Sequence, residues 1–315
     1  MKTKAWLVLA SSLLALVGPA AFLGRSQETK KKELTHQISV RAISIAVTVQ
    51  DRGGRYINDL TRKDFTIYEN GVPCPITYFQ HDFEAPVSLT VLLDVSGSMA
   101  VGNKLEESKE VLRTLLTTLL RARDEASLLI FADGEVEVAA GFSTDRTAFL
   151  AELDKVEAYG QTALNDAVAV SPEFARKGTK EKRALLLVTD GVENDSRTTP
   201  ELALEIARRV DIPIYVIGYK IPRSEEYLRR HKRAPTLTPT GIIDTLERFS
   251  LATGGKPFLI DEPGAMMAAV QEIRRELSHQ YILGYTSYKS EGNEYRKITV
   301  ETAKKKYRVR TRAGY

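Results

Sequence analysis

The sequence contains little cysteine and little histidine. Its 315 residues include one cysteine and four histidines. A single cysteine excludes a disulfide within the chain, so the stability of the fold must come from core packing. That cysteine, Cys74, lies in the β-like segment VPCPITYF, and we expect it to be a small buried apolar residue. At 43% hydrophobic and 27% charged residues, the chain is long enough and apolar enough to bury a large core.

Sequence motifs of several common enzyme classes are missing. The chain has no GxxxxGK[ST] phosphate loop, no GxSxG elbow and no HExxH zinc motif. No nucleophile with a neighbouring base can be assigned. We therefore predict that the protein is not an enzyme. The histidines, which lie outside the polar segments described below, are His36, His81, His231 and His279.

Only one apolar run is long enough to matter for a membrane. Residues 1–26 begin with the basic MKTK, continue with an apolar run and carry small residues near its end, which is typical of a secretory signal peptide. We predict an extracytoplasmic protein, whether periplasmic, cell-surface or secreted. The alternative is that the same run stays as an uncleaved membrane anchor. The net charge of +4 is small and falls further without this segment, so we expect no nucleic-acid partner.

From about residue 87, apolar runs alternate with helical segments. Runs such as VSLTVLLDV and ALLLVTDG are almost continuously apolar, as expected for strands covered on both faces. This alternation predicts an α/β fold with a doubly wound, mostly parallel sheet. The helices are predicted at residues 103–121, 146–157, 163–177 and 199–210, followed by a helix, the strand KPFLI and a closing helix.

The segments on either side of this unit read as β structure. In ISVRAISIAVTVQD the apolar residues recur every second position, with one slip near Ala42 that predicts a bulge. Asn70-Gly71 separates two β-rich runs and predicts a hairpin. The tail also contains strand-like runs, and we predict that both flanks pair into one small β-sandwich-like domain. Two separate β appendages are the alternative.

These patterns define the predicted domain boundaries. A long basic insertion at 220–241 is expected to be a solvated surface excursion. The predicted parts are a signal peptide at 1–26, the first part of the β domain at 35–84, the α/β domain at 85–280 and the second part of the β domain at 281–315.

Five oxygen-bearing side chains follow strands or precede a helix in the α/β unit. They are Asp94, Ser96, Ser98, Thr162 and Asp190. In an open parallel sheet, ligands bind at the carboxyl edge where the strand order reverses, and all three segments can meet there. Two carboxylates and three hydroxyls form a hard oxygen environment, which selects Mg²⁺, Mn²⁺ or Ca²⁺ over zinc or copper. An Asp or Glu of a partner protein could displace a water and complete the shell of such an ion.

The segments DVSGSM, GQTALNDAV and TDG together resemble the metal-ion-dependent adhesion site of von Willebrand factor A-type domains. The flanking segments resemble the exported bacterial proteins related to this domain. The resemblance implies that Ser96 and Ser98 bind Mg²⁺ directly, that Asp94 and Asp190 bind it directly or through water, and that Thr162 joins in one conformational state.

Each segment also has a simpler interpretation when taken alone. DVSGSM could open the helix that follows, and Asp-Gly is a general turn signal. Near the site, we expect Glu193 and Asp195 to be loop surface and Asp166 to cap or orient a helix. The joint occurrence favours an exported, non-enzymatic adhesion-type module that captures a partner's carboxylate. The alternatives are an envelope component with a purely stabilising ion and a Mg²⁺-dependent hydrolase.

Overall fold

The computed structural model describes residues 39–224, 238–289 and 294–315. The predicted signal peptide at 1–26 and most of the insertion at 220–241 lie outside these residues. The main helices are α1 (Lys104–Thr114), α2 (Arg146–Lys155), α3 (Leu164–Ala175), α4 (Pro200–Arg209), α6 (Pro239–Thr253) and α7 (Pro263–Ser278). The strands of the α/β unit are β5 (Val87–Asp94), β6 (Glu125–Ala132), β7 (Glu135–Ser143), β8 (Lys182–Thr189), β9 (Ile214–Tyr219) and β10 (Pro257–Ile260).

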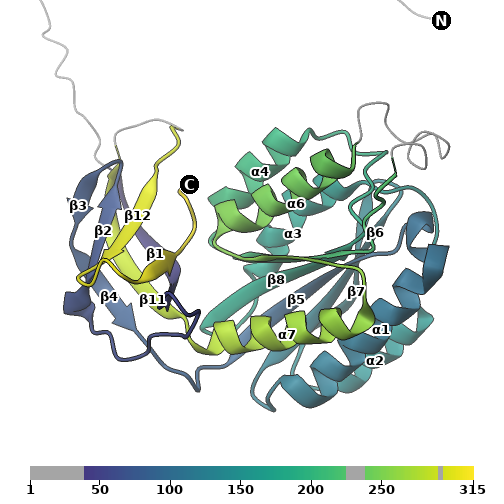
Figure 1. Ribbon diagram of the computed structural model, residues 1–315, viewed down its shortest axis with the longest axis horizontal. Helices are drawn as coiled ribbons and strands as arrows, with labels where there is room; N and C mark the ends of the chain where they lie inside the picture. The colour runs from purple at the N-terminus through teal and green to yellow at the C-terminus, as the bar shows by residue number, and fades with distance from the viewer. Residues whose placement is uncertain (1–38, 225–237, 290–293) are drawn as a thin grey trace, which may run out of the picture. The chain divides into compact units, whose positions relative to one another are not determined.

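These six strands form one sheet in the order β10-β9-β8-β5-β6-β7. Neighbouring strands run parallel, except that β7 pairs with β6 in the antiparallel direction. Helices cover both faces (Figure 1): α1, α2 and α7 pack on one face, and α3, α4 and α6 pack on the other. The predicted α/β class is confirmed. The edge strand β7 was not predicted, because its residues are mostly exposed or half-buried and lack a continuous apolar run.

The strand order places β5 at the point where the chain connections reverse from one side of the sheet to the other. The chain passes from β5 to β6 on one side and later returns to β8 on the other side of β5. Every residue of β5 and of β6 is buried, which explains their uninterrupted apolar character. Because β5 and β8 are parallel neighbours, their carboxyl ends lie side by side at the switch point.

The flanking segments form two antiparallel sheets. One has the order β13-β1-β11-β4 and the other the order β12-β2-β3. Because β1 comes before the α/β unit and β11 after it, their pairing confirms that the two flanks fold together. The strands are β1 (Ser39–Gln50), β2 (Phe65–Glu69), β3 (Val72–Cys74), β4 (Ile76–Gln80), β11 (Tyr281–Lys289), β12 (Ile298–Thr302) and β13 (Arg308–Arg310).

Local predictions in these sheets had mixed outcomes. Asn70 and Gly71 adopt φ angles of 49° and 81° in the turn between β2 and β3, so the predicted hairpin is confirmed. The bulge predicted near Ala42 is wrong, because β1 pairs with β11 without a break from Ser39 to Val47. Cys74 is half-buried rather than fully buried, at the end of a short strand. In the part of the chain that the structure describes, no helix is both long enough and apolar enough to cross a membrane.

A buried carboxylate connects the two flanking sheets. Glu69, at the end of β2, accepts hydrogen bonds from Tyr285 Oη at 2.8 Å and Ser287 Oγ at 2.8 Å on β11. Arg296 Nη1 at 2.5 Å and Tyr315 Oη at 3.0 Å also donate hydrogen bonds to Glu69. Burial raises the pKa of Glu69, but these hydrogen bonds outweigh burial and hold the pKa below its ordinary value of 4.5.

We expect Glu69→Gln to lower the free energy of unfolding at pH 7 by about 2 kcal/mol, the scale of hydrogen bonds to a charged group. Because the folded-state pKa is lowered, the ionised group stabilises the fold above pH 4.5, and this contribution is lost as the pH falls below that value. The difference in the free energy of unfolding between wild type and Glu69→Gln, measured by urea titration, should therefore become smaller below pH 4.5. Glu301→Gln, on the exposed side of β12, is the control and should change stability by less than about 0.5 kcal/mol. A difference in the free energy of unfolding that stays constant with pH would contradict a stabilising role of ionised Glu69.

Candidate metal site at the sheet edge

The first segment of the site follows directly from β5. Asp94 is the last residue of the strand, and its Oδ1 accepts the backbone N–H of Ser96 at 2.9 Å. The chain then makes a short helical turn, in which the hydroxyls of Ser96 and Ser98 lie 3.1 Å apart. The exposed fractions of the three residues are 0%, 0% and 3% in chain order. The alternate spacing therefore brings three oxygen-bearing side chains to one buried place.

The second segment, around Thr162, is hydrogen-bonded to the first. The N–H of Gly97 donates to Gly160 O at 3.0 Å, and the N–H of Tyr159 donates to Val95 O at 2.8 Å. Gly160 has a φ of 66°, and a Cβ there would lie 2.3 Å from the carboxylate of Asp133. The positive φ and the closeness of Asp133 therefore favour glycine at position 160.

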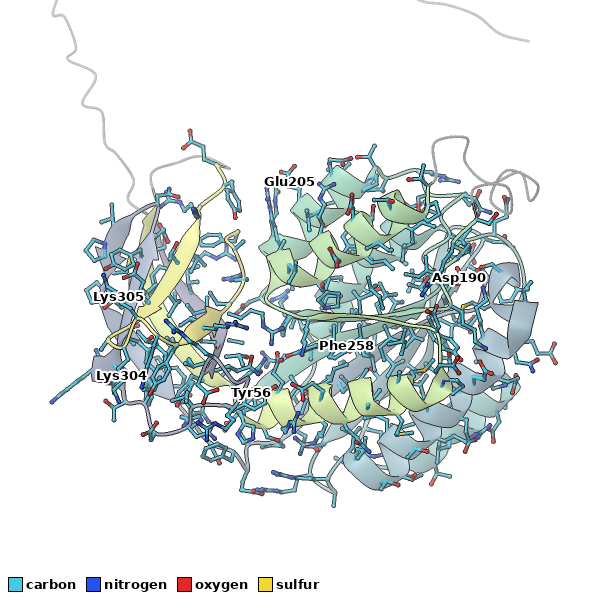
Figure 2. The ribbon with its side chains drawn as sticks, in the orientation of Figure 1. Tyr56, Asp190, Glu205, Phe258, Lys304 and Lys305 are labelled. Carbon is cyan, nitrogen blue, oxygen red and sulfur yellow. The ribbon has the colours of Figure 1, made fainter. Side chains whose placement is uncertain are left out.

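The third segment follows β8 and contacts both of the others. Asp190 is fully buried, and its Oδ1 accepts the N–H of Val192 at 3.1 Å. The preceding residue, Thr189, donates its hydroxyl to Asp94 Oδ2 at 2.6 Å. The backbone N–H groups of Asn194 and Asp195 each donate a hydrogen bond to Thr162 O at 3.0 Å. The structure thus brings the three predicted segments together at the carboxyl ends of β5 and β8, where Figure 2 labels Asp190.

Burial and like charge dominate the electrostatics of the site. Burial raises the pKa of Asp94, and the negative charge of Asp190 raises it further. Hydrogen bonds from Thr189 and Ser96 act in the opposite direction without cancelling the rise. Lys104, the first residue of α1, provides a positive charge, because its Nζ lies 2.5 Å from Asp190 Oδ2. Two buried carboxylates therefore share a site that contains one ammonium group.

The polar groups of the site fit a hard cation. Thr162 Oγ1 and Asn165 Oδ1 are buried and have no hydrogen-bond partner within the described parts of the chain. A buried oxygen without a partner costs free energy, so such groups usually face a ligand, an ion or water. Among the described residues, no group of three or more His, Cys, Asp or Glu side chains is placed to hold a metal ion. The candidate donors are instead two carboxylates and three hydroxyls, and oxygen donors of these kinds suit Mg²⁺.

Neighbouring acidic residues organise the loops around these groups. Glu193 accepts hydrogen bonds from the N–H groups of Asn165, Asp195 and Ser196, at 2.8 to 3.0 Å. Asp166 accepts the N–H groups of the next two residues of that loop. Asp166 therefore holds a loop, whereas the sequence predicts that it caps or orients a helix. Glu193, predicted to be loop surface, instead holds the loop beside Thr162.

Sequence reasoning missed Lys104 and Thr189. A lysine at the start of a helix ordinarily indicates a solvated side chain, and nothing in its neighbours shows that it turns toward Asp190. Thr189 stands in an apolar strand, where a single threonine is typical of packing. Both roles depend on which strand ends and helix starts meet in space.

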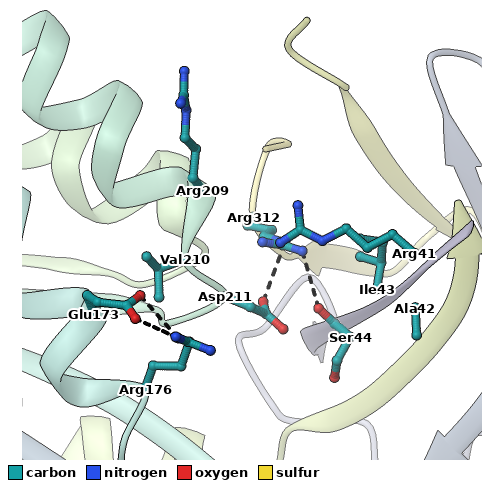
Figure 3. Close-up of a pocket in the computed structure, with 10 residues that line it drawn as sticks. All are labelled: Arg41, Ala42, Ile43, Ser44, Glu173, Arg176, Arg209, Val210, Asp211 and Arg312. Carbon is teal, nitrogen blue, oxygen red and sulfur yellow. Dashed lines mark hydrogen bonds and ion pairs between the residues drawn. The ribbon is translucent and has the colours of Figure 1, made fainter. Parts of the chain in front are cut away.

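A separate hollow lies at the other end of the parallel strands, away from the candidate site. Its volume is about 430 Å³ (Figure 3). Among its lining residues are four arginines, but Arg176 pairs with Glu173, and Arg312 Nε lies 3.4 Å from Asp211 Oδ1. Asp211 comes just before β9, so this hollow is at the amino end of the parallel strands and is not part of the candidate site. The lining residues are Arg41, Ala42, Ile43, Ser44, Glu173, Arg176, Arg209, Val210, Asp211 and Arg312.

Comparison with known proteins identifies the type of domain. Residues 89–193 match the family model of the von Willebrand factor type A domain. A Borreliella burgdorferi protein named "Uncharacterized protein" is 25% identical over 206 residues, which are 61% of this chain and 59% of that protein. This chain therefore spans well under two thirds of its relative's length.

Two solved structures are among those that are similar to this chain. The BatB protein of Bacteroides thetaiotaomicron is 20% identical, with a TM-score of 0.46 and coverage of 60% of this chain and 98% of that chain. The open conformation of the pilus adhesin SpaC from Lactobacillus rhamnosus GG is 10% identical, with a TM-score of 0.50 and coverage of 85% and 47%. At these identities the likeness concerns the fold alone.

We expect Gly160→Ala to destabilise the protein by about 2 kcal/mol, because alanine is strained at positive φ and its Cβ would displace the Asp133 carboxylate. Urea unfolding measures the effect. Gly141→Ala is the matched control, because a Cβ there meets nothing within 4 Å and its φ is not positive. Equal losses of stability in the two variants would show that position 160 does not lie against Asp133 with a positive φ as described.

Proposed function

We propose that this chain, whose residues 89–193 match a von Willebrand factor A-type domain, is an exported, non-enzymatic binding protein. Domains of this type often mediate protein binding and are generally non-catalytic. In the proposal, a divalent cation captures a carboxylate of a partner protein. Mg²⁺ is the proposed ion, and the proposed ligands are Asp94, Ser96, Ser98, Thr162 and Asp190.

One observation carries the proposal: the hydroxyl of Thr162 is buried and has no hydrogen-bond partner among the residues that the structure describes. A threonine hydroxyl can donate one hydrogen bond and accept two, and burying it unsatisfied costs about 1–3 kcal/mol. In a loop built only for stability, an apolar residue of the same shape would avoid that cost. A bound cation accounts for the cost, because the hydroxyl oxygen then has a partner.

The other proposed ligands support the same ion. Asp94 and Asp190 are fully buried and close enough for the charge of one to raise the pKa of the other. A divalent cation between two such groups would remove their repulsion. The serines of the first segment would add neutral oxygens. Mg²⁺ prefers six oxygen ligands and keeps water where the protein offers none.

Exchangeable water on the ion explains why a partner's carboxylate is the proposed ligand. A carboxylate is a hard oxygen ligand with a full charge, so it displaces water from Mg²⁺ more readily than a neutral carbonyl does. The ion would then supply affinity, and the surface around it would supply specificity. The extracytoplasmic location remains a prediction, because residues 1–26 lie outside the described parts of the chain.

The first test separates the metal role of Thr162 from a structural role. Thr162→Val removes the unpartnered hydroxyl, so the metal-free protein should be as stable as wild type or more stable. Its affinity for Mg²⁺, measured by calorimetric titration, should fall by about tenfold or more, the loss that about 1.4 kcal/mol produces.

Thr90→Val is the matched control for this variant. Thr90 is fully buried on β5, and its hydroxyl accepts a hydrogen bond from Ser127 at 3.0 Å. This control should lose stability and keep its Mg²⁺ affinity, which is the reverse pattern. Equal Mg²⁺ affinities of wild type and Thr162→Val would remove the observation on which the proposed function rests.

A second test addresses the captured group. Acetate should bind to the Mg²⁺-loaded protein and shift the NMR signals of the loops around Asp94, Thr162 and Asp190. Acetamide has the same shape without the charge and is the control ligand. We expect acetate to bind only when Mg²⁺ is present and acetamide not to bind at all. Acetate binding that persists in chelator would contradict capture through the ion, and it would favour a purely stabilising ion.

A further inference from the structure

Lys104 occupies an unusual position for a lysine. Its side chain is 6% exposed, and its Nζ lies 2.5 Å from Asp190 Oδ2. It is also the first residue of α1, where the positive end of the helix dipole disfavours a cation. Burying an ammonium group is costly unless it is paired. The helix dipole therefore opposes this ammonium group, and only its pairing with Asp190, one of the proposed metal ligands, offsets the cost of its burial.

The charges show what this ammonium does to the site. Counting only Asp94, Asp190 and Lys104, with both carboxylates ionised, the metal-free site has a net charge of minus one. A divalent cation would bring the site to plus one. Without Lys104 the corresponding charges would be minus two and zero. The lysine therefore makes the site less attractive to the metal and makes the loaded site positive.

We propose that Lys104 is a specificity-determining residue that lowers the affinity of the site for the divalent cation and raises the affinity of the loaded site for an external carboxylate. The inference deepens the proposed function and rests on it. The ammonium is tethered at the site, so it competes with the incoming cation for Asp190. Once the cation is bound, the same positive charge remains close by and attracts the anionic ligand.

A purely structural lysine would behave differently. If Lys104 only held α1 against the end of β8, its removal would loosen the loops, and the affinities for metal and for carboxylate would fall together. The proposed role predicts changes in opposite directions. This difference in sign separates the two roles without any assumption about the partner protein.

The test is Lys104→Met, which keeps a long unbranched side chain and removes the charge. Calorimetric titration with Mg²⁺ should show an affinity at least about tenfold higher than that of wild type, which corresponds to about 1.4 kcal/mol. Titration of the Mg²⁺-loaded variant with acetate, followed by NMR, should show an affinity at least about tenfold lower. Lys104→Gln keeps a hydrogen-bond donor without the charge. Like Lys104→Met, it should raise the affinity for Mg²⁺ and lower the affinity of the loaded protein for acetate.

Lys109→Met is the matched control. Lys109 lies on the same helix and is 5% exposed, but its Nζ donates to Val156 O and Glu106 Oε1 at 3.0 Å each. Its removal should leave both affinities unchanged. If Lys104→Met folds only in the presence of Mg²⁺, Lys104→Gln supplies the two affinities instead.

The failures of the two proposals are distinguishable. If wild-type protein binds no Mg²⁺, the proposed function fails and this inference fails with it. If wild type binds Mg²⁺ and acetate while Lys104→Met and Lys104→Gln change neither affinity, or lower both, the inference alone is overturned.

Discussion

The structure at the sheet edge depends on two carboxylates, Asp94 and Asp190, that are buried side by side at the ends of neighbouring strands. Removing one charge from water costs several kcal/mol, and a like charge nearby adds to that cost. The surrounding groups all reduce it. Backbone N–H groups, the Thr189 hydroxyl and the Lys104 ammonium point at these two side chains. The local fold is thus built around a concentration of negative charge that packing alone would not produce.

The location of the two carboxylates follows from topology. The chain leaves β5 toward one side of the sheet and returns on the other, so the connections that follow β5 and β8 diverge at the carboxyl ends of these strands. Short loops fill that place. One of them passes so close to Asp133 that glycine is favoured at position 160. The order of the strands therefore opens the site, and the loops set its dimensions.

Much of this arrangement could be predicted from the sequence, because it depends on local patterns. Continuous apolar runs identified the buried parallel strands, and carboxylates at the ends of those runs identified the candidate ligands. The pairing of β1 with β11 was also predicted, since both flanks were visibly β-like and the inserted unit needed its ends together.

The features that escaped prediction depend on contacts between distant residues. β7 is an exposed edge strand, so it lacks the apolar run by which the other strands were recognised. The slip near Ala42 predicts a bulge, yet the strand pairs continuously there. Glu69 stands in an ordinary β strand, and its four partners come from residues more than 200 positions away. No local pattern contains that information.

Lys104 bears on the choice between a stabilising ion and a capturing ion. A site that evolved only to tie loops together with a cation would gain from every negative charge and lose from every positive one. A buried ammonium paired with one of the proposed ligand carboxylates, as Lys104 is with Asp190, would weaken such a site. In a capturing site the same charge is useful, because neutrality is reached only when an outside carboxylate arrives. The position of Lys104 therefore favours a site whose ion is completed by a partner over a site that is complete within the chain.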